Sequence, residues 1–252
     1  MAKKSHKKRA DLLLVEKGLV ETREKAQALI MEGLVYTPSG RVLKPGTPTT
    51  TDTPLEVRGR LPYVGRGGLK LAHALDRFGL DPSDLVALDV GASTGGFTDC
   101  LLQRDARKVF ALDVGHGQLD YRLRQDPRVT VMEGVNAHYP FTLPVPPQEK
   151  GAQKVDLATI DVSFISVVKV IPQVSEHVRD GGRIIVLLKP QFEAMRGEVG
   201  RGGIIKNPEV HARVLARAIL WIADSAFRLR GLVPSPILGD AGNREFFLLL
   251  ET

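Results

Sequence analysis

The strongest constraint on the fold is an alternation of apolar strands with helices that starts at residue 84. Five segments have the length and the apolar composition of buried strands: 84–90, 108–114, 129–133, 155–161 and 183–188. The first of them runs into a glycine-rich turn at 89–96 (DVGASTGG), and a helix is expected to follow at 97–104. Strands that alternate with helices in this way are typical of a three-layer α/β fold with a mostly parallel sheet.

The last quarter of the chain extends the pattern. Asn207 is a suitable cap for a helix that opens with Pro208 and ends near Ser225. Two further strands are expected near 228–232 and 245–250. We therefore predict a Rossmann-like α/β body with a sheet of seven mostly parallel strands.

The composition indicates a folded protein without disulfides or membrane spans. Of 252 residues, 43% are hydrophobic and 25% are charged, as in globular proteins. The single cysteine, Cys100, excludes an intramolecular disulfide, and we expect a cytoplasmic location. The longest apolar runs, 184–188 and 246–250, are far shorter than the roughly 20 residues that span a bilayer. The basic start of the chain is followed by polar residues, so we expect no signal peptide.

Positive charge is concentrated at the start of the chain. Residues 1–60 hold 12 Lys/Arg and 7 Asp/Glu, whereas the remainder holds 23 and 22. Two short helices that end at glycines precede short strands, and the stretch 58–68 (RGRLPYVGRGG) has the composition of a linker. We predict a polyanion-binding α+β domain at 1–57, a linker at 58–68 and the α/β body at 69–252. Charge alone leaves a solvated basic tail as the alternative.

The head resembles the RNA-binding module of the ribosomal protein S-four type. The matching residues lie at 9–18 (RADLLLVEKG), 22–23 (TR), 33–35 (GLV) and 44–45 (KP). One position departs from the pattern, because Ala10 stands where a leucine is usual. The resemblance implies that four basic residues contact RNA: Arg9, Arg23, Lys25 and Lys44. A folded face of clustered Lys and Arg binds phosphates independently of any family name.

The glycine-rich turn narrows the class of nucleotide ligand. Ligands of such sheets sit beyond the carboxyl ends of the strands. The turn lacks the Gly-Lys-Ser/Thr ending of a P-loop, and it has Ser93 in place of the middle glycine that lets a backbone approach a pyrophosphate. A ligand without a pyrophosphate fits better, and S-adenosylmethionine is such a ligand. Asp113, 22 residues after Gly91, is placed to accept its ribose hydroxyls.

The predicted cofactor residues follow the ends of the first three strands. The turn is expected to close on the methionine end, and Asn136 is expected to reach the adenine. The full set is Asp89, Gly91, Ser93, Gly95, Gly96, Asp113 and Asn136. On its own, Asp113 is equally well explained as a solvated strand end.

Four charged residues lie at elements that the fold brings together: Lys70, Asp161, Lys189 and Glu245. Each of them alone has the ordinary interpretation of a surface charge. Together they resemble the Lys-Asp-Lys-Glu tetrad of FtsJ-type ribose 2'-O-methyltransferases. A ribose hydroxyl must lose its proton as it attacks a sulfonium methyl, and lysine serves as that base only where burial and a second ammonium favour its neutral form. In this scheme Lys189 is the base, Lys70 assists it, and no metal is needed.

The motifs as a whole resemble the TlyA (haemolysin A-like) family. They are YVGRGGLKL at 63–71, DVGASTGGFTDCLL at 89–102, ALDVGHGQL at 111–119, DVSFIS at 161–166 and LLKPQFEA at 187–194. The resemblance implies a class I methyltransferase body that methylates the cytidine 2'-hydroxyl of ribosomal RNA and flips the target nucleotide. Gly65 departs from the pattern, since a serine is expected there. Ribosomal RNA or a ribosomal subunit is the implied partner, with no membrane.

Two other classes of function would explain parts of the sequence. A non-catalytic ribosome-assembly or RNA-binding factor would keep the basic head but could lose the tetrad, and all four residues are present. A membrane-lytic haemolysin needs an amphipathic or spanning segment that the sequence does not contain. The sequence leaves open the modified nucleotide, the ribosomal subunit and the oligomeric state.

Overall fold

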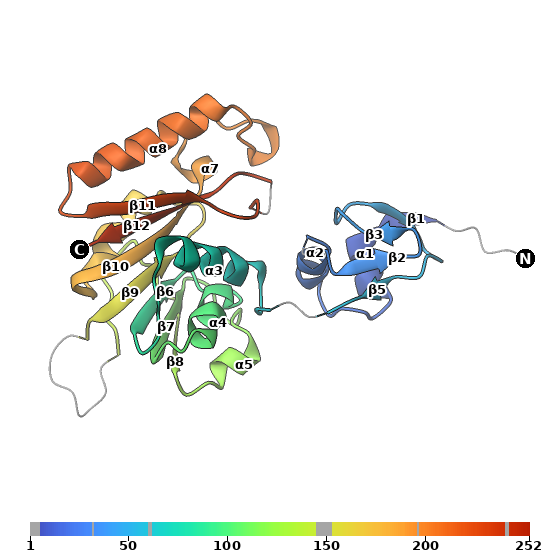
Figure 1. The fold of residues 1–252 in the computed structure, drawn as a ribbon, viewed down its shortest axis with the longest axis horizontal. Coiled ribbons are helices and arrows are strands. Elements are labelled where there is room, and N and C mark those ends of the chain that lie inside the picture. Colours follow the sequence, from blue (N-terminus) through green and yellow to red (C-terminus); the bar gives the residue numbers. More distant parts are fainter. Residues whose placement is uncertain (1–5, 32, 60–61, 145–152, 196, 240–241) are drawn as a thin grey trace, which may run out of the picture. The chain divides into compact units, whose positions relative to one another are not determined.

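The computed structural model describes residues 6–31, 33–59, 62–144, 153–195, 197–239 and 242–252 (Figure 1). The chain divides into two compact units, Met1–Arg66 and Gly67–Thr252. In the described part of the chain, no helix has both the length and the apolar character needed to cross a membrane.

The first unit packs two helices against short strands. Its helices are α1 (Ala10–Glu16) and α2 (Arg23–Met31), and its strands are β1 (Lys7–Arg9), β2 (Val35–Thr37), β3 (Gly40–Arg41), β4 (Pro48–Thr50) and β5 (Glu56–Val57). β1 pairs with β4, and β3, β2 and β5 form a second small sheet. A core that includes Leu13, Leu14 and Ile30 holds the helices to the strands. The basic residues at 7–9 therefore belong to a paired strand.

The second unit is built on a sheet of seven strands. In chain order they are β6 (Val86–Val90), β7 (Lys108–Asp113), β8 (Val129–Glu133), β9 (Val155–Ile160), β10 (Val178–Leu188), β11 (Arg228–Pro234) and β12 (Phe246–Glu251). Their order in the sheet is β11-β12-β10-β9-β6-β7-β8. The five strands from β8 to β10 are parallel, and β12 runs antiparallel to both of its neighbours. This Rossmann-like arrangement confirms the predicted fold class.

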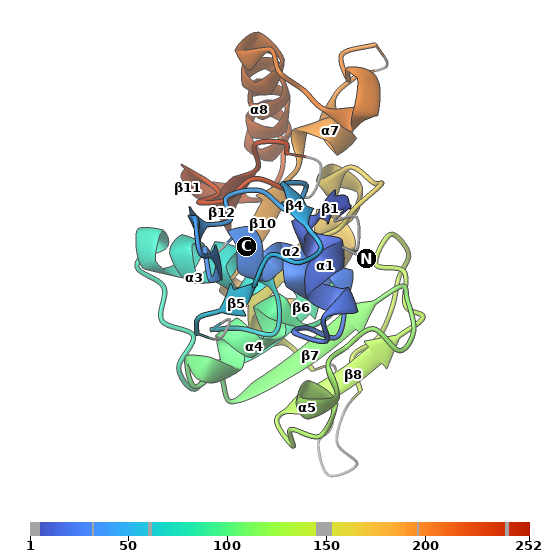
Figure 2. The ribbon, with the colours of Figure 1, turned by 90° about the vertical axis from the view of Figure 1, so that its right-hand side faces the viewer.

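Helices cover both faces of the sheet, as Figures 1 and 2 show. They are α3 (Arg66–Phe78), α4 (Gly96–Gln103), α5 (Tyr121–Arg124), α6 (Ile171–Ser175), α7 (Pro190–Glu193) and α8 (Pro208–Ala223), with 3-10 turns η1 (Val167–Lys169) and η2 (Arg201–Gly203). The predicted cap of α8 is confirmed, because Asn207 Oδ1 accepts a hydrogen bond of 2.9 Å from the Glu209 amide.

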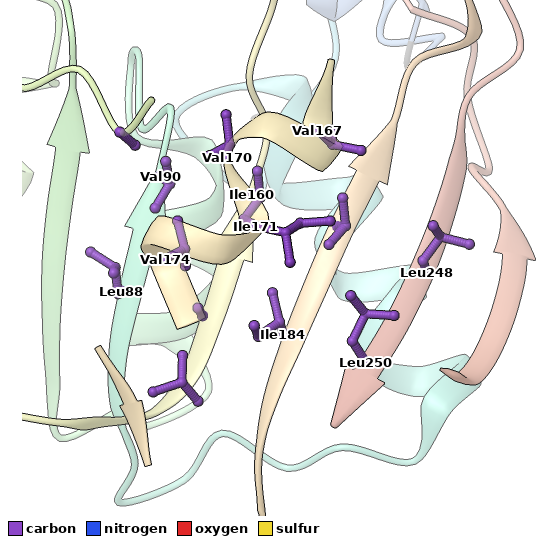
Figure 3. Packing of buried hydrophobic residues seen from close by; sticks show 14 of the residues in the cluster. Leu88, Val90, Ile160, Val167, Val170, Ile171, Val174, Ile184, Leu248 and Leu250 are labelled. Carbon is purple, nitrogen blue, oxygen red and sulfur yellow. The ribbon is translucent and has the colours of Figure 1, made fainter. Parts of the chain in front are cut away.

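Alternation along each strand sends successive side chains to opposite faces. Leu88 and Val90 of β6 point to the face where η1, α6 and α8 pack, and Ile184 of β10 and Leu248 of β12 join the same buried cluster (Figure 3). Because side chains alternate, Asp89 points to the other face, where α4 packs. This alternation explains how a charged residue sits in an otherwise apolar strand.

Two predicted boundaries are displaced in the structure. β10 begins at Val178, five residues before the predicted start, because Val178 pairs with Val155 and the strand continues through a register shift at Gly181, where φ is +69°. Helix α3 begins at Arg66, inside the segment predicted as a linker. Within that segment, 60 and 61 lie outside the described residues.

Candidate active site

The site begins where the strand order reverses, between β6 and β9. Connections leave these two strands in opposite directions, and open α/β sheets bind their ligands in the crevice that lies beyond the carboxyl ends of the strands at such a point. The Asp161 amide donates a hydrogen bond of 2.9 Å to the Val90 carbonyl and joins the two strand ends. Gly91 follows with φ +85°, and a Cβ atom there would lie 2.3 Å from the Asp161 carbonyl oxygen. Only glycine allows so close an approach at this φ.

The glycine-rich turn is folded over Asp113 at the end of β7. The Ser93 amide donates to one oxygen of the Asp113 carboxylate and the Gly115 amide donates to the other, each at 2.7 Å. A carboxylate accepts about four hydrogen bonds, so Asp113 keeps capacity for ribose hydroxyls. Asn136 follows Val135, whose amide donates to the Asp113 carbonyl at 3.1 Å. It is exposed, and its side-chain oxygen accepts from the His138 amide at 3.0 Å.

The end of the turn packs against α3. A Cβ atom at Gly96 would lie 2.9 Å from the Gly68 amide nitrogen, and one at Gly95 would lie 2.2 Å from a Leu123 methyl group. Both glycines therefore serve close packing. The contact at Gly96 brings the first turn of α3, and with it Lys70, next to the glycine-rich turn.

Asp89 has a different environment from the other predicted cofactor residues. Its side chain is fully buried between two hydroxyl groups, with Thr98 Oγ1 donating at 2.7 Å and Thr159 Oγ1 at 2.9 Å. Burial raises the pKa of this carboxyl to about 6, and the charge of Asp161 adds to the rise. Asp89 thus holds α4 and β9 together from beneath the turn instead of facing the crevice.

The four predicted catalytic residues form two ion pairs at this edge of the sheet. Lys189 Nζ lies 2.6 Å from Asp161 Oδ1, and Lys70 Nζ lies 2.7 Å from Glu245 Oε2. Leu188 pairs with Phe246 across β10 and β12. Lys189 and Glu245 are the next residues beyond that pair, so both lie at the carboxyl end of β10. The fold therefore brings all four residues to one edge.

The electrostatics of this edge are balanced. Two ammonium groups meet two carboxylates, and the side chains of Lys70 and Glu245 are only 10% and 3% exposed. A buried charge needs a partner, and here each has one. The arrangement holds two amines in fixed positions beside the crevice, which is what a reaction that requires alignment of a nucleophile needs.

Several residues of the site carry contacts that the sequence did not reveal. Ser163 accepts a hydrogen bond of 3.0 Å from Lys189 Nζ. Phe164 is 91% exposed and has φ +64°, and its ring centroid lies 5.1 Å from that of Phe192. Glu193 accepts from Ser166 and Val167. The only sequence signal was that these residues lie inside the motifs DVSFIS and KPQFEA.

In the first unit, two of the predicted RNA contacts share one buried carboxylate. Arg9 donates twice to Asp11, at 2.9 and 2.8 Å, and Arg23 Nε donates at 3.1 Å. Burial opposes ionisation of Asp11, but hydrogen bonds from Arg9, Gln27 and Arg23 prevail and hold its pKa well below the ordinary value. The sequence analysis did not single out Asp11.

The other two predicted contacts lie apart from this carboxylate. Lys44 is exposed in the loop beside Arg9, where Gly46 lies close to the Arg9 guanidinium. Lys25, in the first turn of α2, instead pairs at 3.1 Å with Glu21, which precedes the helix. The described contacts thus gather Arg9, Arg23 and the loop of Lys44, and leave Lys25 in a separate pair.

Comparisons with known proteins find relatives that match nearly the whole chain. The chain is 48% identical to the provisionally named rRNA methyltransferase YqxC of Bacillus subtilis, over 98% of this chain and 86% of that protein. It is 39% identical to the 16S/23S rRNA (cytidine-2'-O)-methyltransferase TlyA of Mycobacterium tuberculosis, over 97% of this chain and 90% of that protein. A solved structure of a provisionally named hemolysin from Streptococcus thermophilus is 43% identical, with a TM-score of 0.73, and covers 98% of this chain and 89% of that one.

The family comparison covers the whole second unit. The model of the FtsJ-like methyltransferases matches residues 63–252, which include both ion pairs and the glycine-rich turn. The predicted family is therefore confirmed, and the chain belongs to the FtsJ-like methyltransferases, together with the proteins named TlyA.

Proposed function

We propose that this protein transfers a methyl group from S-adenosylmethionine to the 2'-hydroxyl of a cytidine ribose in ribosomal RNA. The observation that carries the proposal is the placement of Lys189 and Asp161 as an ion pair directly beyond the strand ends, beside the glycine-rich turn. The similarity to YqxC and TlyA supports ribosomal RNA as the substrate, and the similarity to TlyA supports cytidine as the target nucleotide.

The residues around the turn fit S-adenosylmethionine. Asp113 offers a carboxylate for the two ribose hydroxyls, and its backbone contacts hold the turn in place. Gly91 and Ser93 leave the turn without bulky side chains on the crevice side, and Asn136 is exposed for the adenine. The cofactor supplies an electrophilic methyl group on a positively charged sulfur.

The chain's own residues position and deprotonate the hydroxyl. In its neutral form, Lys189 Nζ accepts the hydroxyl proton as the oxygen attacks the methyl group, while Asp161 and Ser163 hold the amine in place. Lys70, held by Glu245, supplies a second amine that orients the ribose oxygen.

RNA binding is divided between the two units in this proposal. The first unit supplies guanidinium groups of Arg9 and Arg23, whose remaining donors bind phosphates. In the second unit, the exposed ring of Phe164 lies on the segment that carries Asp161 and offers a surface for a nucleobase. We assign most of the RNA affinity to residues 1–57, and the nucleobase contact and the chemistry to residues 69–252.

The test is a single-turnover methylation assay with labelled S-adenosylmethionine and ribosomal subunits, followed by mass mapping of the RNA. The intact protein is expected to place a methyl group on a cytidine ribose. Lys189→Ala should lose the rate by at least 100-fold while cofactor and RNA binding stay within a few-fold, because the base acts in the transition state.

Lys108→Ala is the matched control. This lysine lies at the amino end of β7, at the opposite edge of the sheet, and should keep the parent rate. Binding of ribosomal RNA without any methyl transfer would instead support a non-catalytic assembly factor. Methyl transfer by Lys189→Ala near the parent rate would refute the lysine-base mechanism.

A further inference from the structure

We propose that Glu193 is a positioning residue for the methyl transfer, which joins the segment of Asp161 to the segment of Lys189. The inference rests on the proposed function. The two segments, 161–167 and 189–193, follow neighbouring strands, β9 and β10. Each carries one member of the Lys189–Asp161 ion pair.

Contacts join the two segments at three successive places. Lys189 reaches Asp161 and Ser163 at the start, and the rings of Phe164 and Phe192 meet in the middle. At the far end, Glu193 Oε2 accepts from Ser166 Oγ at 2.6 Å and Oε1 accepts from the Val167 amide at 2.7 Å. The Glu193 contacts are the only ones of the three that involve neither the ion pair nor an exposed ring.

Glu193 also supplies a cap that the local sequence lacks. Ser166 stands at the N-cap position of η1 but its hydroxyl makes no capping bond, so the first amide of this turn takes its acceptor from Glu193. Burial raises the pKa of Glu193, because the partly buried carboxylate is removed from water. The hydrogen bonds from Ser166 and Val167 only partly offset this rise. Its backbone is held in turn, since Arg217 donates to the Glu193 carbonyl at 3.3 Å.

The segment 161–167 needs an anchor at each end. Phe164 has φ +64°, a left-handed conformation that bulky residues rarely adopt and that persists only where the surroundings impose it. The Asp161 amide, bound to the Val90 carbonyl, fixes the start of the segment. Glu193 fixes its end. With that end released, the segment is free to relax, and the distance and direction from Asp161 to Lys189 are no longer imposed.

Three substitutions of Glu193 separate the effects of side-chain length, charge and hydrogen bonding. Glu193→Gln keeps the length: its amide oxygen accepts from Val167, and its amide nitrogen donates to Ser166 Oγ. Glu193→Asp keeps the charge but is one methylene too short to reach both donors. Glu193→Ala loses both contacts. We expect a single-turnover rate within threefold of the parent for Gln, and losses of about 10-fold or more for Asp and Ala.

The readouts distinguish positioning from folding. For Glu193→Ala, the loss should appear in the maximal rate at saturating cofactor and RNA, with the dissociation constant for S-adenosylmethionine within threefold and the thermal midpoint close to the parent. Glu251→Ala is the matched control: Glu251 is an ion-paired carboxylate at the opposite end of the sheet, where it binds Arg183 and Arg230, and none of its described contacts reaches the segments 161–167 or 189–193. It should keep the parent rate.

Hydrogen exchange gives a measurement that does not depend on activity. Glu193→Ala should speed amide exchange in 161–167 by 10-fold or more, whereas Glu251→Ala should leave that segment unchanged. If Glu193→Ala does not fold, Ser166→Ala removes one of the two bonds and should show smaller changes in the same direction. An unchanged rate and unchanged exchange in Glu193→Ala would overturn the proposal. An inactive parent with faster exchange in the variant would refute the proposed function and leave Glu193 with only the structural role of joining the two segments.

Discussion

The ammonium of Lys70 and the carboxylate of Glu245 meet at 2.7 Å, although 175 residues separate them in the chain. Lys70 comes from the first helix of the second unit and Glu245 from the residue before its last strand. The pair therefore joins the beginning of the α/β body to its end, at the edge where Lys189 and Asp161 also lie.

Removing one partner of this pair should destabilise the protein strongly. Glu245→Leu leaves an unpaired buried ammonium, and a loss of about 3–5 kcal/mol in unfolding free energy is expected. The double variant Lys70→Met/Glu245→Leu should recover most of that stability, because no charge remains buried, yet it should not recover methyl transfer. Urea unfolding and the single-turnover assay measure the two quantities. Restored activity in the double variant would show that the pair is purely structural.

Gly91→Ala should damage the cofactor site more than its backbone conformation alone predicts. A Cβ atom would overlap the Asp161 carbonyl oxygen and force β6 and β9 apart at the crevice. Gly79→Ala is the control, since Gly79 has φ +63° and open space around it. It should cost only about 1–2 kcal/mol, the price of a left-handed alanine. Calorimetric titration should show lost S-adenosylmethionine binding for Gly91→Ala alone, and equal affinities would contradict the role of this approach.

Asp89 should make stability depend on pH in a known direction. Its folded-state pKa of about 6 lies above the ordinary value of 3.8, so the folded protein binds this proton more tightly than the unfolded chain does. The stabilisation is complete below pH 3.8 and is lost as pH rises through 6. Asp89→Asn mimics the neutral acid and lacks this loss.

The unfolding free energy of Asp89→Asn, taken relative to the parent, should therefore rise by on the order of 3 kcal/mol from pH 4 to pH 7. Denaturant titrations of both proteins at several pH values measure it, and other carboxylates cancel in the difference. A difference that stays constant across this range would show that Asp89 does not carry the raised pKa.

Removal of the first unit should separate RNA binding from cofactor binding. Residues 62–252 include the complete second unit with its own core. This fragment should bind S-adenosylmethionine like the intact protein but bind ribosomal RNA at least 10-fold more weakly, because Arg9, Arg23 and Lys44 are gone. For the intact protein, RNA affinity should also fall steeply with salt. Equal RNA affinity of the fragment would place the main contacts in the second unit.

Local sequence patterns were sufficient for the fold class. Strand length, apolar alternation, the glycine-rich turn and the cap at Asn207 act within a few residues, so each is readable without knowledge of distant partners. The same holds for the ends of the strands, which is why Asp113, Asp161 and Lys189 could be named as a group. The start of β10 was wrong by five residues, because its first pairing, with Val155, crosses a glycine bulge that resembles a turn in the sequence.

By itself, the sequence determined which residues carry charge at the carboxyl edge, but the tertiary structure decided how they pair. Lys189 pairs with Asp161, and Lys70 pairs with Glu245, because strand order and the packing of α3 bring these residues together. The burial of Asp89, the left-handed Phe164 and the bridge made by Glu193 arise in the same way. Each depends on contacts between separate elements. Such contacts form only when the whole chain has folded, so no local sequence pattern predicts them.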